Sequence, residues 1–395
     1  MFKQYIKEQL ALRQSTGLLR ELICADSHGK NLEVAGKRYI NFAGNDYLGI
    51  ASASAKPLSA SSGATASPLV TGRGKIHCRL EQHLLNWVEA PQDFRCLLFS
   101  SGYAANTGVI SALFNQRNGE ARLVQDKLNH ASLMDAGKHV QALGHCRQLR
   151  FQHNDVSSLD KILSTKCQLE APKLVVTEGV FSMDGDSADI RQIRQSASAQ
   201  QAWFMLDDAH GIGVKGDRGQ GSFAEQGIQL LESDIYVVTF GKAIGAQGAA
   251  VIAHKDTIDY LANFSREYVY STHISPLQAE AVIHNIGVIQ QQPWRREKLS
   301  SNIELFRELA RELPFTLLPS DSAIQPVMVG DENLAMSLAS GLKQQGIWTG
   351  AMRYPTVAKD QARLRVTITA NHEQSDIKLL IESLAKLAGE SYVEC

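Results

Sequence analysis

The chain has 395 residues, of which 44% are apolar, and a formal net charge of -1. This apolar fraction is enough for a large core and excludes a wholly disordered chain, while the length indicates two or three folding units. The near-neutral charge argues against a nucleic-acid binder that works by general attraction to phosphates.

The chain begins with MFKQYIKEQLALRQSTGLLREL, which is predicted to form an amphipathic helix and to open a helical segment over residues 1–40. Charges are spread along this stretch, and it holds no long apolar core, so it is typical neither of a secretory signal nor of a membrane span. No later stretch is long and apolar enough to cross a bilayer. We therefore expect a soluble, cytoplasmic protein.

Short apolar runs alternate with helical patterns between residues 41 and 291. The clearest runs are CLLFS (Cys96–Ser100), KLVVTEG (Lys173–Gly179), WFMLDD (Trp203–Asp208) and DIYVVTF (Asp234–Phe240). Near-continuous apolar strands separated by helices predict a mostly parallel sheet that is covered by helices on both faces. We therefore expect a large α/β domain over residues 41–291.

The pattern changes after residue 291, and a smaller α+β domain is predicted over residues 292–395. DENLAMSLASGLKQQG and EQSDIKLLIESLAKLAG are predicted helices. Between them, RLRVTITA (Arg363–Ala370) alternates, with its large apolar residues on one face and Arg363 and Arg365 on the other. This alternation predicts a half-buried strand.

Ligands of open α/β sheets usually bind beyond the carboxyl ends of the strands, and polar residues follow several predicted strands here. SGYAAN (Ser101–Asn106) leaves backbone N–H groups open at a strand-to-helix turn, which suits a phosphate, although an ordinary tight turn fits equally well. His130 precedes a predicted helix. It either caps or packs that helix, which is the commoner case, or stacks its imidazole on a planar ring.

Carboxylates and other polar groups follow the next two strands. Glu178 and Ser182 lie beyond one strand, and Asp207, with His210 three residues later, lies beyond the next. A carboxylate at such a position is costly unless a cation meets it. Helix capping is the alternative for Asp207 and for its neighbour Asp208.

The stretch VVTFGKAIGAQGAAV places a single lysine, Lys242, among small residues just after an apolar strand. An exposed loop position is the commonest fate of a lysine. Small neighbours nevertheless let a flat ligand approach, and a confined amine with a lowered pKa becomes a nucleophile towards carbonyls. A phosphate seat, an aspartate, a flanking histidine and such a lysine together predict a pyridoxal phosphate site.

The six cysteines stand singly and form no C-x-x-C pair, which is typical of a reducing compartment. His77 and Cys78 are adjacent, but adjacent residues rarely share a metal, and no second ligand pair lies near them in the sequence. We therefore predict no metal site and expect pyridoxal phosphate as the only cofactor.

Six motifs resemble those of the α-oxoamine synthases: NDYLG, SGYAAN, NHASLMDAG, TEGVFSMDGD, DDAHGIGV and TFGKAIGAQGAA. The likeness covers nearly the whole chain. It implies a fold-type-I pyridoxal phosphate enzyme with a mostly parallel seven-stranded sheet flanked by helices, a smaller C-terminal α+β domain and an N-terminal helix. Enzymes of this family join an amino acid to an acyl-CoA with loss of carbon dioxide.

The same resemblance implies a role for each matching residue. Lys242 matches the lysine that holds the cofactor and then removes the α-proton. Asp207 matches the partner of the ring nitrogen, His210 the group beside the phenolic oxygen, and His130 the histidine that stacks on the ring. Further cofactor contacts are implied for Gly102, Tyr103, Ser182 and Thr239, and for Ser271 and Thr272 towards the cofactor of a neighbouring subunit.

Substrates and partners are implied in the same way. Arg365 matches the arginine that grips the amino-acid carboxylate, and the other substrate-binding matches are Arg20, Asn45, His130, Arg353 and Thr356. The contacts to a neighbouring subunit imply a homodimer with shared active sites. VVTFGK, SAIQP followed by VGD, and an arginine before PTV resemble the biotin-pathway branch, which uses L-alanine and a pimeloyl thioester of CoA or of acyl-carrier protein.

Three alternatives stay open. Another α-oxoamine synthase, such as a glycine C-acetyltransferase, would take glycine or serine and a different acyl-CoA. Transamination on the same fold would need no thioester. A non-catalytic cofactor-binding protein would need no proton-abstracting lysine. Nucleic acids and membranes are not expected as partners in any of these cases.

Overall fold

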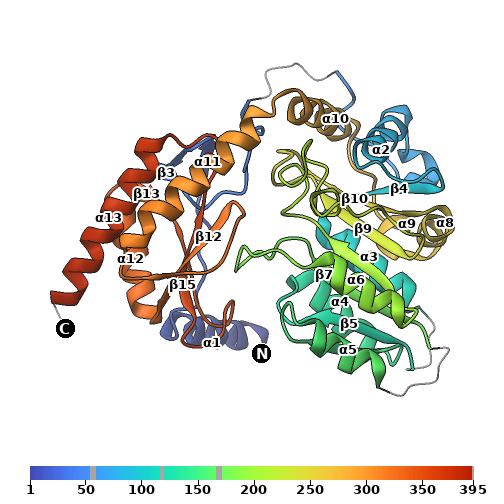
Figure 1. Ribbon diagram of the computed structural model, residues 1–395, viewed down its shortest axis with the longest axis horizontal. Coiled ribbons are helices and arrows are strands. Elements are labelled where there is room, and N and C mark those ends of the chain that lie inside the picture. The colour runs from blue at the N-terminus through green and yellow to red at the C-terminus, as the bar shows by residue number, and fades with distance from the viewer. Residues whose placement is uncertain (54–58, 116–119, 166–170, 394–395) are drawn as a thin grey trace.

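The computed structural model describes residues 1–53, 59–115, 120–165 and 171–393, and Figure 1 shows a large α/β unit beside a smaller α+β unit. A seven-stranded sheet of order β4-β10-β9-β8-β7-β5-β6 forms the centre of the large unit. Its strands are β4 (Phe94–Phe99), β5 (Arg122–Asp126), β6 (Arg147–Phe151), β7 (Lys173–Glu178), β8 (Trp203–Asp207), β9 (Asp234–Thr239) and β10 (Ala249–His254). Only β10 runs antiparallel to its neighbours. The predicted sheet is therefore confirmed.

Side chains alternate across this sheet and fill two apolar clusters. On β9, Tyr236 and Val238 join one cluster, and Ile235 and Val237 join the other. Because both faces are dry, the strands have nearly continuous apolar sequences.

Helices cover both faces of the large sheet. They are the π-helix η1 (Pro68–Gly72), α2 (Lys75–Trp87), α3 (Gly102–Leu113), α4 (Ala131–Ala142), α5 (Val156–Ser164), α6 (Ile190–Ala199), α7 (Ser222–Glu225), α8 (Lys255–Phe264), α9 (Arg266–Val269) and α10 (Pro276–Gln291). No helix in the described part of the chain combines the length and the apolar composition that a membrane-crossing segment requires.

The smaller unit packs helices on an antiparallel sheet of order β11-β12-β15-β14. Its strands are β11 (Thr316–Leu317), β12 (Ile324–Gly330), β14 (Gly350–Met352) and β15 (Ala362–Thr367). Its helices are α11 (Trp294–Leu309), the 3-10 helix η2 (Ala310–Glu312), α12 (Glu332–Gln344) and α13 (Gln374–Val393). The two helices predicted for this region correspond to α12 and α13.

The prediction that β15 is half-buried is wrong, because all six of its residues are buried. Leu364 and Val366 join the apolar core as expected. The other face meets the large unit rather than water: Arg363 forms an ion pair with Asp184, and Arg365 donates a hydrogen bond into the same segment of the large unit. Alternation reveals that a strand has two faces, but it does not reveal what covers the polar one.

The N-terminal segment predicted as helical over residues 1–40 is only partly so. α1 (Phe2–Ser15) has no buried residue. Three short strands follow it, β1 (Ala25–His28), β2 (Asn31–Val34) and β3 (Lys37–Asn41), and β3 pairs in parallel with β13 (Ile347–Trp348). The three strands are only four or five residues long. β1 and β3 lack a clear apolar alternation, and β2 (NLEV) alternates over four residues only.

Candidate active site

A cavity of about 310 Å³ opens at the carboxyl ends of β7, β8 and β9, beside the turn from β4 into α3. The predicted site residues that line it are Asn45, Gly102, Tyr103, His130, Asp207, His210, Thr239 and Lys242. Neighbouring parallel strands end at the same edge of a sheet, so residues far apart in the sequence meet there.

Asp207 ends β8, and only 4% of its surface is exposed. Its Oδ2 accepts a hydrogen bond from Asn106 Nδ2 at 2.6 Å, and its Oδ1 accepts one from the backbone N–H of Ala209 at 3.0 Å. Both partner nitrogens can only donate, so the site is built for the carboxylate form of Asp207. Asn106 had no predicted role of its own, although it lies in the SGYAAN motif on α3.

Asp208, the next residue, does not cap a helix. Its carboxylate is fully buried and accepts hydrogen bonds from the Ser222 backbone N–H at 2.7 Å, the Ser222 hydroxyl at 2.5 Å and the Tyr236 hydroxyl at 2.6 Å. Burial raises the pKa of Asp208 to about 6. The two adjacent aspartates therefore differ in role, since Asp207 lines the cavity and Asp208 ties β8 to the Ser222 turn and to β9.

Lys242 follows β9 and lies half-buried on the cavity wall. Burial lowers the pKa of its amine, while the charges of Asp207 and Glu178 act in the opposite direction. The net lowering favours the neutral, nucleophilic form of the amine over that of an exposed lysine at the same pH. The small residues around Lys242 predicted such a confined amine with a lowered pKa.

Glu178, at the end of β7, is a second buried carboxylate in the cavity, and the sequence analysis gave it no specific role. It accepts a hydrogen bond from the backbone N–H of His130. Burial, and then the charge of Asp207, raise its pKa. The sequence predicted that Glu178 follows a strand. It did not predict that Glu178 would accept a hydrogen bond from His130, 48 residues away.

His130 caps α4 and also lines the cavity, so capping leaves its ring at the site, and stacking on a planar ring stays a prediction. Its Nδ1 accepts a hydrogen bond from the backbone N–H of Ser132 at 3.2 Å and lies 2.8 Å from the Ser132 hydroxyl oxygen. A backbone N–H can only donate, so the proton of the neutral ring is on Nε2. Desolvation lowers the pKa of His130, and the charge of Lys242 adds to this effect.

A chain of hydrogen bonds connects His210 to Arg365. The Nδ1 of His210 lies 2.6 Å from the Tyr47 hydroxyl, which donates to Asn45 Oδ1 at 3.2 Å, and Arg365 Nη2 donates to the same oxygen at 3.4 Å. Burial raises the pKa of Tyr47 to about 12 and lowers that of His210, which keeps both groups neutral near pH 7. Tyr47 was missed as a site residue, although it lies within the NDYLG motif.

Arg365 adjoins the cavity and is itself buried. Besides the bond to Asn45, its Nε donates to the backbone carbonyl of Ser182 at 2.7 Å, and its Nη1 donates to the Thr367 hydroxyl at 3.1 Å. These bonds use three of the five N–H groups of a guanidinium. Tyr47 forms a further side-chain hydrogen bond with this guanidinium. A guanidinium held in place in this way suits the recognition of a carboxylate.

The turn from β4 into α3 carries the predicted phosphate seat. Ser101 caps α3 by accepting a hydrogen bond from the Ala104 backbone N–H at 3.1 Å. A Cβ on Gly102 would lie 2.5 Å from Cγ2 of Thr239, so only glycine lets the helix start so close to β9. The buried Oγ1 of Thr239 has no hydrogen-bond partner in the part of the chain that the structure describes.

Pyridoxal phosphate fits this set of donors. The unpaired Thr239 hydroxyl and the N-terminus of α3 suit its phosphate, the Asp207 carboxylate suits a protonated ring nitrogen, and the Lys242 amine suits its carbonyl carbon.

Seven predicted residues do not line this cavity: Arg20, Ser182, Ser271, Thr272, Arg353, Thr356 and Arg365. Arg20, Thr272 and Thr356 are exposed, and Ser271 is half-buried. Arg353 lies beside the segment that follows α1, because a Cβ on Gly17 would be 3.1 Å from its Nη1. The roles of all seven stay predictions.

The sequence model of the family "Aminotransferase class I and II" matches residues 37–384. A curated relative from Vibrio campbellii, named 8-amino-7-oxononanoate synthase, is 43% identical over 396 residues, which cover 98% of this chain and 99% of the relative.

Solved structures have the same fold. The 8-amino-7-oxononanoate synthase from Francisella tularensis is similar with a TM-score of 0.74 at 27% identity, over 90% of this chain and 99% of that one. A serine palmitoyltransferase from S. paucimobilis, solved with bound PLP, has a TM-score of 0.85 at 25% identity, over 98% of both chains. The chain therefore belongs to the aminotransferase class I and II family and, within it, to the group of the 8-amino-7-oxononanoate synthases.

Proposed function

We propose that the chain catalyses the pyridoxal-phosphate-dependent condensation of L-alanine with a pimeloyl thioester to 8-amino-7-oxononanoate, with release of carbon dioxide and the thiol carrier, in biotin biosynthesis. The observation that carries this proposal is the cavity in which Lys242, Asp207 and His130 converge beside a phosphate seat. The names of the full-length relatives support the choice of substrates over glycine or serine. When bound, pyridoxal phosphate supplies an electron sink for the bond that breaks at the substrate α-carbon.

Two side chains would act on the cofactor directly. The Asp207 carboxylate, fixed by Asn106 and by the Ala209 N–H, would hold a proton on the ring nitrogen of the cofactor. The Lys242 amine, with its lowered pKa, would hold the cofactor through its carbonyl carbon and, once released, would remove the α-proton of the substrate as a general base.

Other side chains would orient the two substrates. Arg365 would offer its guanidinium to the carboxylate of alanine and so orient the substrate. His130 would hold the ring of the cofactor, and its Nε2–H would donate to the thioester oxygen. His210, connected through Tyr47 and Asn45 to Arg365, would hold the phenolic oxygen of the cofactor.

The proposal includes a cytoplasmic homodimer in which Ser271 and Thr272 complete the phosphate site of the neighbouring subunit. Support comes from the position of these residues: neither lines the cavity of its own chain, and Thr272 is exposed. The thioester carrier is CoA or acyl-carrier protein. Arg20, Arg353 and Thr356 are proposed as contacts to the acyl substrate or its carrier.

Thiol release from pimeloyl-CoA by the cofactor-loaded protein tests the proposed reaction, with L-alanine, glycine or L-serine added in separate assays. We expect thiol release with alanine and none above background with the other two. Release with glycine or serine instead would move the chain to another branch of the family. A change of the amino acid without any need for a thioester would indicate transamination and contradict the proposal.

A further inference from the structure

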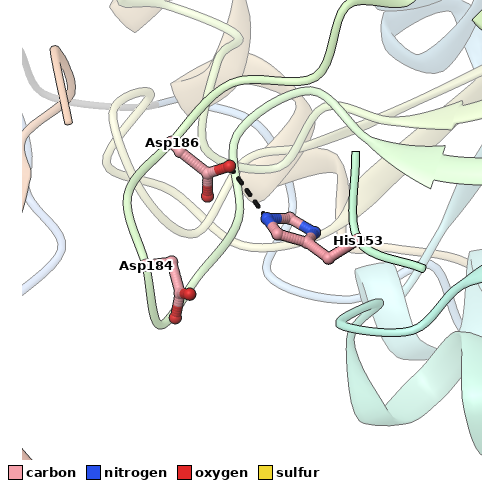
Figure 2. A group of neighbouring side chains, drawn as sticks. All are labelled: His153, Asp184 and Asp186. Carbon is pink, nitrogen blue, oxygen red and sulfur yellow. Dashed lines mark hydrogen bonds and ion pairs between the residues drawn. The ribbon is translucent and has the colours of Figure 1, made fainter. Parts of the chain in front are cut away.

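His153, in the turn between β6 and α5, bridges the carboxylates of Asp126 and Asp186, and Figure 2 shows its contact with Asp186. Its Nδ1 lies 3.0 Å from Asp126 Oδ1, at the end of β5, and its Nε2 lies 2.9 Å from Asp186 Oδ2. An ionised carboxylate oxygen can only accept, so each ring nitrogen that contacts one carries a proton. Burial alone would lower the pKa of His153, but the two aspartates together overcome this effect and raise it to about 10. The side chain is therefore a fixed imidazolium.

The same region contains a group of potential metal ligands, since His153, Asp184 and Asp186 offer atoms within 4.8 Å of one another. A metal ion needs a free nitrogen lone pair on histidine. Both ring nitrogens of His153 face aspartates, and Asp184 pairs with Arg363. The geometry is that of an ion-pair network.

The imidazolium anchors residues 181–187, which we call the clamp loop, to the large unit. Besides the bond to Asp186, the ring of His153 meets the edge of Phe181 with a centroid distance of 4.4 Å and an interplanar angle of 89°. Asn154 adds a hydrogen bond from its Nδ2 to Asp186 Oδ2 at 2.7 Å. The clamp loop is thus held at its first residue and near its last.

The clamp loop also contacts the smaller unit closely. Arg363 Nη1 pairs with Asp184 Oδ1 at 2.5 Å, and the Ser320 hydroxyl donates to the Gly185 carbonyl at 2.8 Å. Gly185 has a φ of +71°, and a Cβ there would lie 2.2 Å from the Ile324 carbonyl oxygen. The loop therefore fits between the two units with no room to shift unless its anchors give way.

The carbonyl of Ser182, within this clamp loop, accepts the Nε–H of Arg365 at 2.7 Å. We propose that His153 is a positioning residue for the amino-acid carboxylate: through the clamp loop it sets the orientation of Arg365. This inference rests on the function proposed above, in which Arg365 binds that carboxylate.

Loss of the His153 charge would act mainly on the loop. Asp126 has a fully buried side chain and accepts hydrogen bonds from the backbone N–H groups of Leu128 and Asn154, so it stays in place. Asp186, which lies on the loop, would face Asp126 without an intervening cation. The two carboxylates would then repel each other across the place of the lost imidazolium. Asp186 would move rather than Asp126, because Asp186 lies on the loop.

The test compares wild type with His153→Gln, using the absorbance of the bound cofactor to titrate L-alanine into the holoenzyme. L-Alaninol, which has the same amine but no carboxylate, is titrated in parallel. We expect the Kd for alanine to rise about tenfold, the size of one misplaced hydrogen bond to a charged group. The Kd for alaninol and the KM for the thioester should stay at wild-type values. His139→Gln, an exposed histidine on α4, serves as the matched control.

Equal alanine affinity in wild type and His153→Gln would overturn the inference, as would an equal loss for alanine and alaninol. A wild-type holoenzyme that binds neither alanine nor any other amino acid would instead contradict the proposed function. If His153→Gln does not fold, Asp186→Ala replaces it, because that variant removes the acceptor of the same anchor and leaves His153 paired with Asp126. A selective loss of alanine affinity in Asp186→Ala supports the inference, and an unchanged affinity overturns it.

Discussion

Lys242 has two tasks in the proposed reaction, since its amine binds the cofactor carbon and later moves the α-proton. Lys242→Ala should therefore lower turnover by about 10³-fold or more. Thiol release from pimeloyl-CoA measures this loss. Lys255→Ala is a suitable control, because Lys255 forms a surface ion pair with Asp93 far from the chemistry. Turnover near the wild-type value in Lys242→Ala would contradict the assignment.

The neighbouring aspartates allow a paired comparison. Asp207→Asn should lower the rate by about 10³-fold, because the amide cannot hold a proton on the ring nitrogen. The protein should still fold, since the amide oxygen can accept the hydrogen bond from Asn106.

Asp208→Asn should have the opposite effect: the stability should fall and the rate should not. It leaves one oxygen for three donors from Ser222 and Tyr236, so we expect a loss of about 1–3 kcal/mol in the free energy of unfolding and an unchanged rate per folded molecule. Urea denaturation and active-site titration separate the two quantities. A rate loss in Asp208→Asn without a loss of stability would show that the division of roles is wrong.

His153 predicts a pH dependence of stability with a definite sign. Its pKa is raised in the folded protein to about 10, against an ordinary value of 6.5, because Asp126 and Asp186 stabilise the charged ring. The stabilisation is fully present below pH 6.5, declines above it and is lost as the pH rises through about 10. Urea denaturation of wild type and His153→Gln should therefore give the largest difference near pH 6 and a vanishing one above pH 10. A difference that grows with pH would contradict the ion-pair network.

Residues that end strands were predictable, whereas their partners were not. Asp207 and Lys242 follow apolar runs, so the topology of a parallel sheet alone places them at one edge. Asn106, Glu178 and Tyr47 work through contacts to residues 101, 48 and 163 positions away. No local pattern encodes such pairs, because they arise from how strands and turns stack in three dimensions.

At the scale of elements, the pair formed by Arg363 on β15 and Asp184 in the clamp loop joins the two units. Arg363→Gln and Asp184→Asn should each raise the KM for alanine, and the double variant should be less impaired than the sum of the two in free energy. A double-mutant cycle on the alanine Kd, read from the cofactor absorbance, measures the coupling. Strictly additive effects would show that the pair does not act as a unit.

Elements of the large sheet were recognisable because they are apolar on both faces and therefore stand out from their surroundings. β4, β7, β8 and β9 each begin and end within two residues of the predicted runs. β1, β2 and β3 were missed because they are short, mostly exposed and polar. The burial of β15 was missed because its polar face is covered by a segment almost 180 residues away.

At the scale of the whole molecule, the proposed homodimer with shared sites makes a quantitative prediction. Lys242→Ala and a Ser271→Ala/Thr272→Ala double variant should each be impaired alone. In a mixed dimer, one active site would then contain the substitutions of both variants, and the other active site would contain none. Random reassociation should restore about a quarter of the wild-type activity, because half of the dimers are mixed. No recovery in mixtures whose subunits exchange would contradict the shared site.

The division of roles between Asp207 and Asp208 has a consequence for which changes the chain can tolerate. Adjacent residues at the end of a strand point to opposite sides. Asp207 therefore faces the cavity, and Asp208 faces the buried Ser222 and Tyr236. A single inserted or deleted codon within β8 would turn each aspartate to the opposite side and damage catalysis and folding together. Length variation among natural and laboratory variants should therefore concentrate in the surface turns before Trp203, while β8 itself varies by substitution alone.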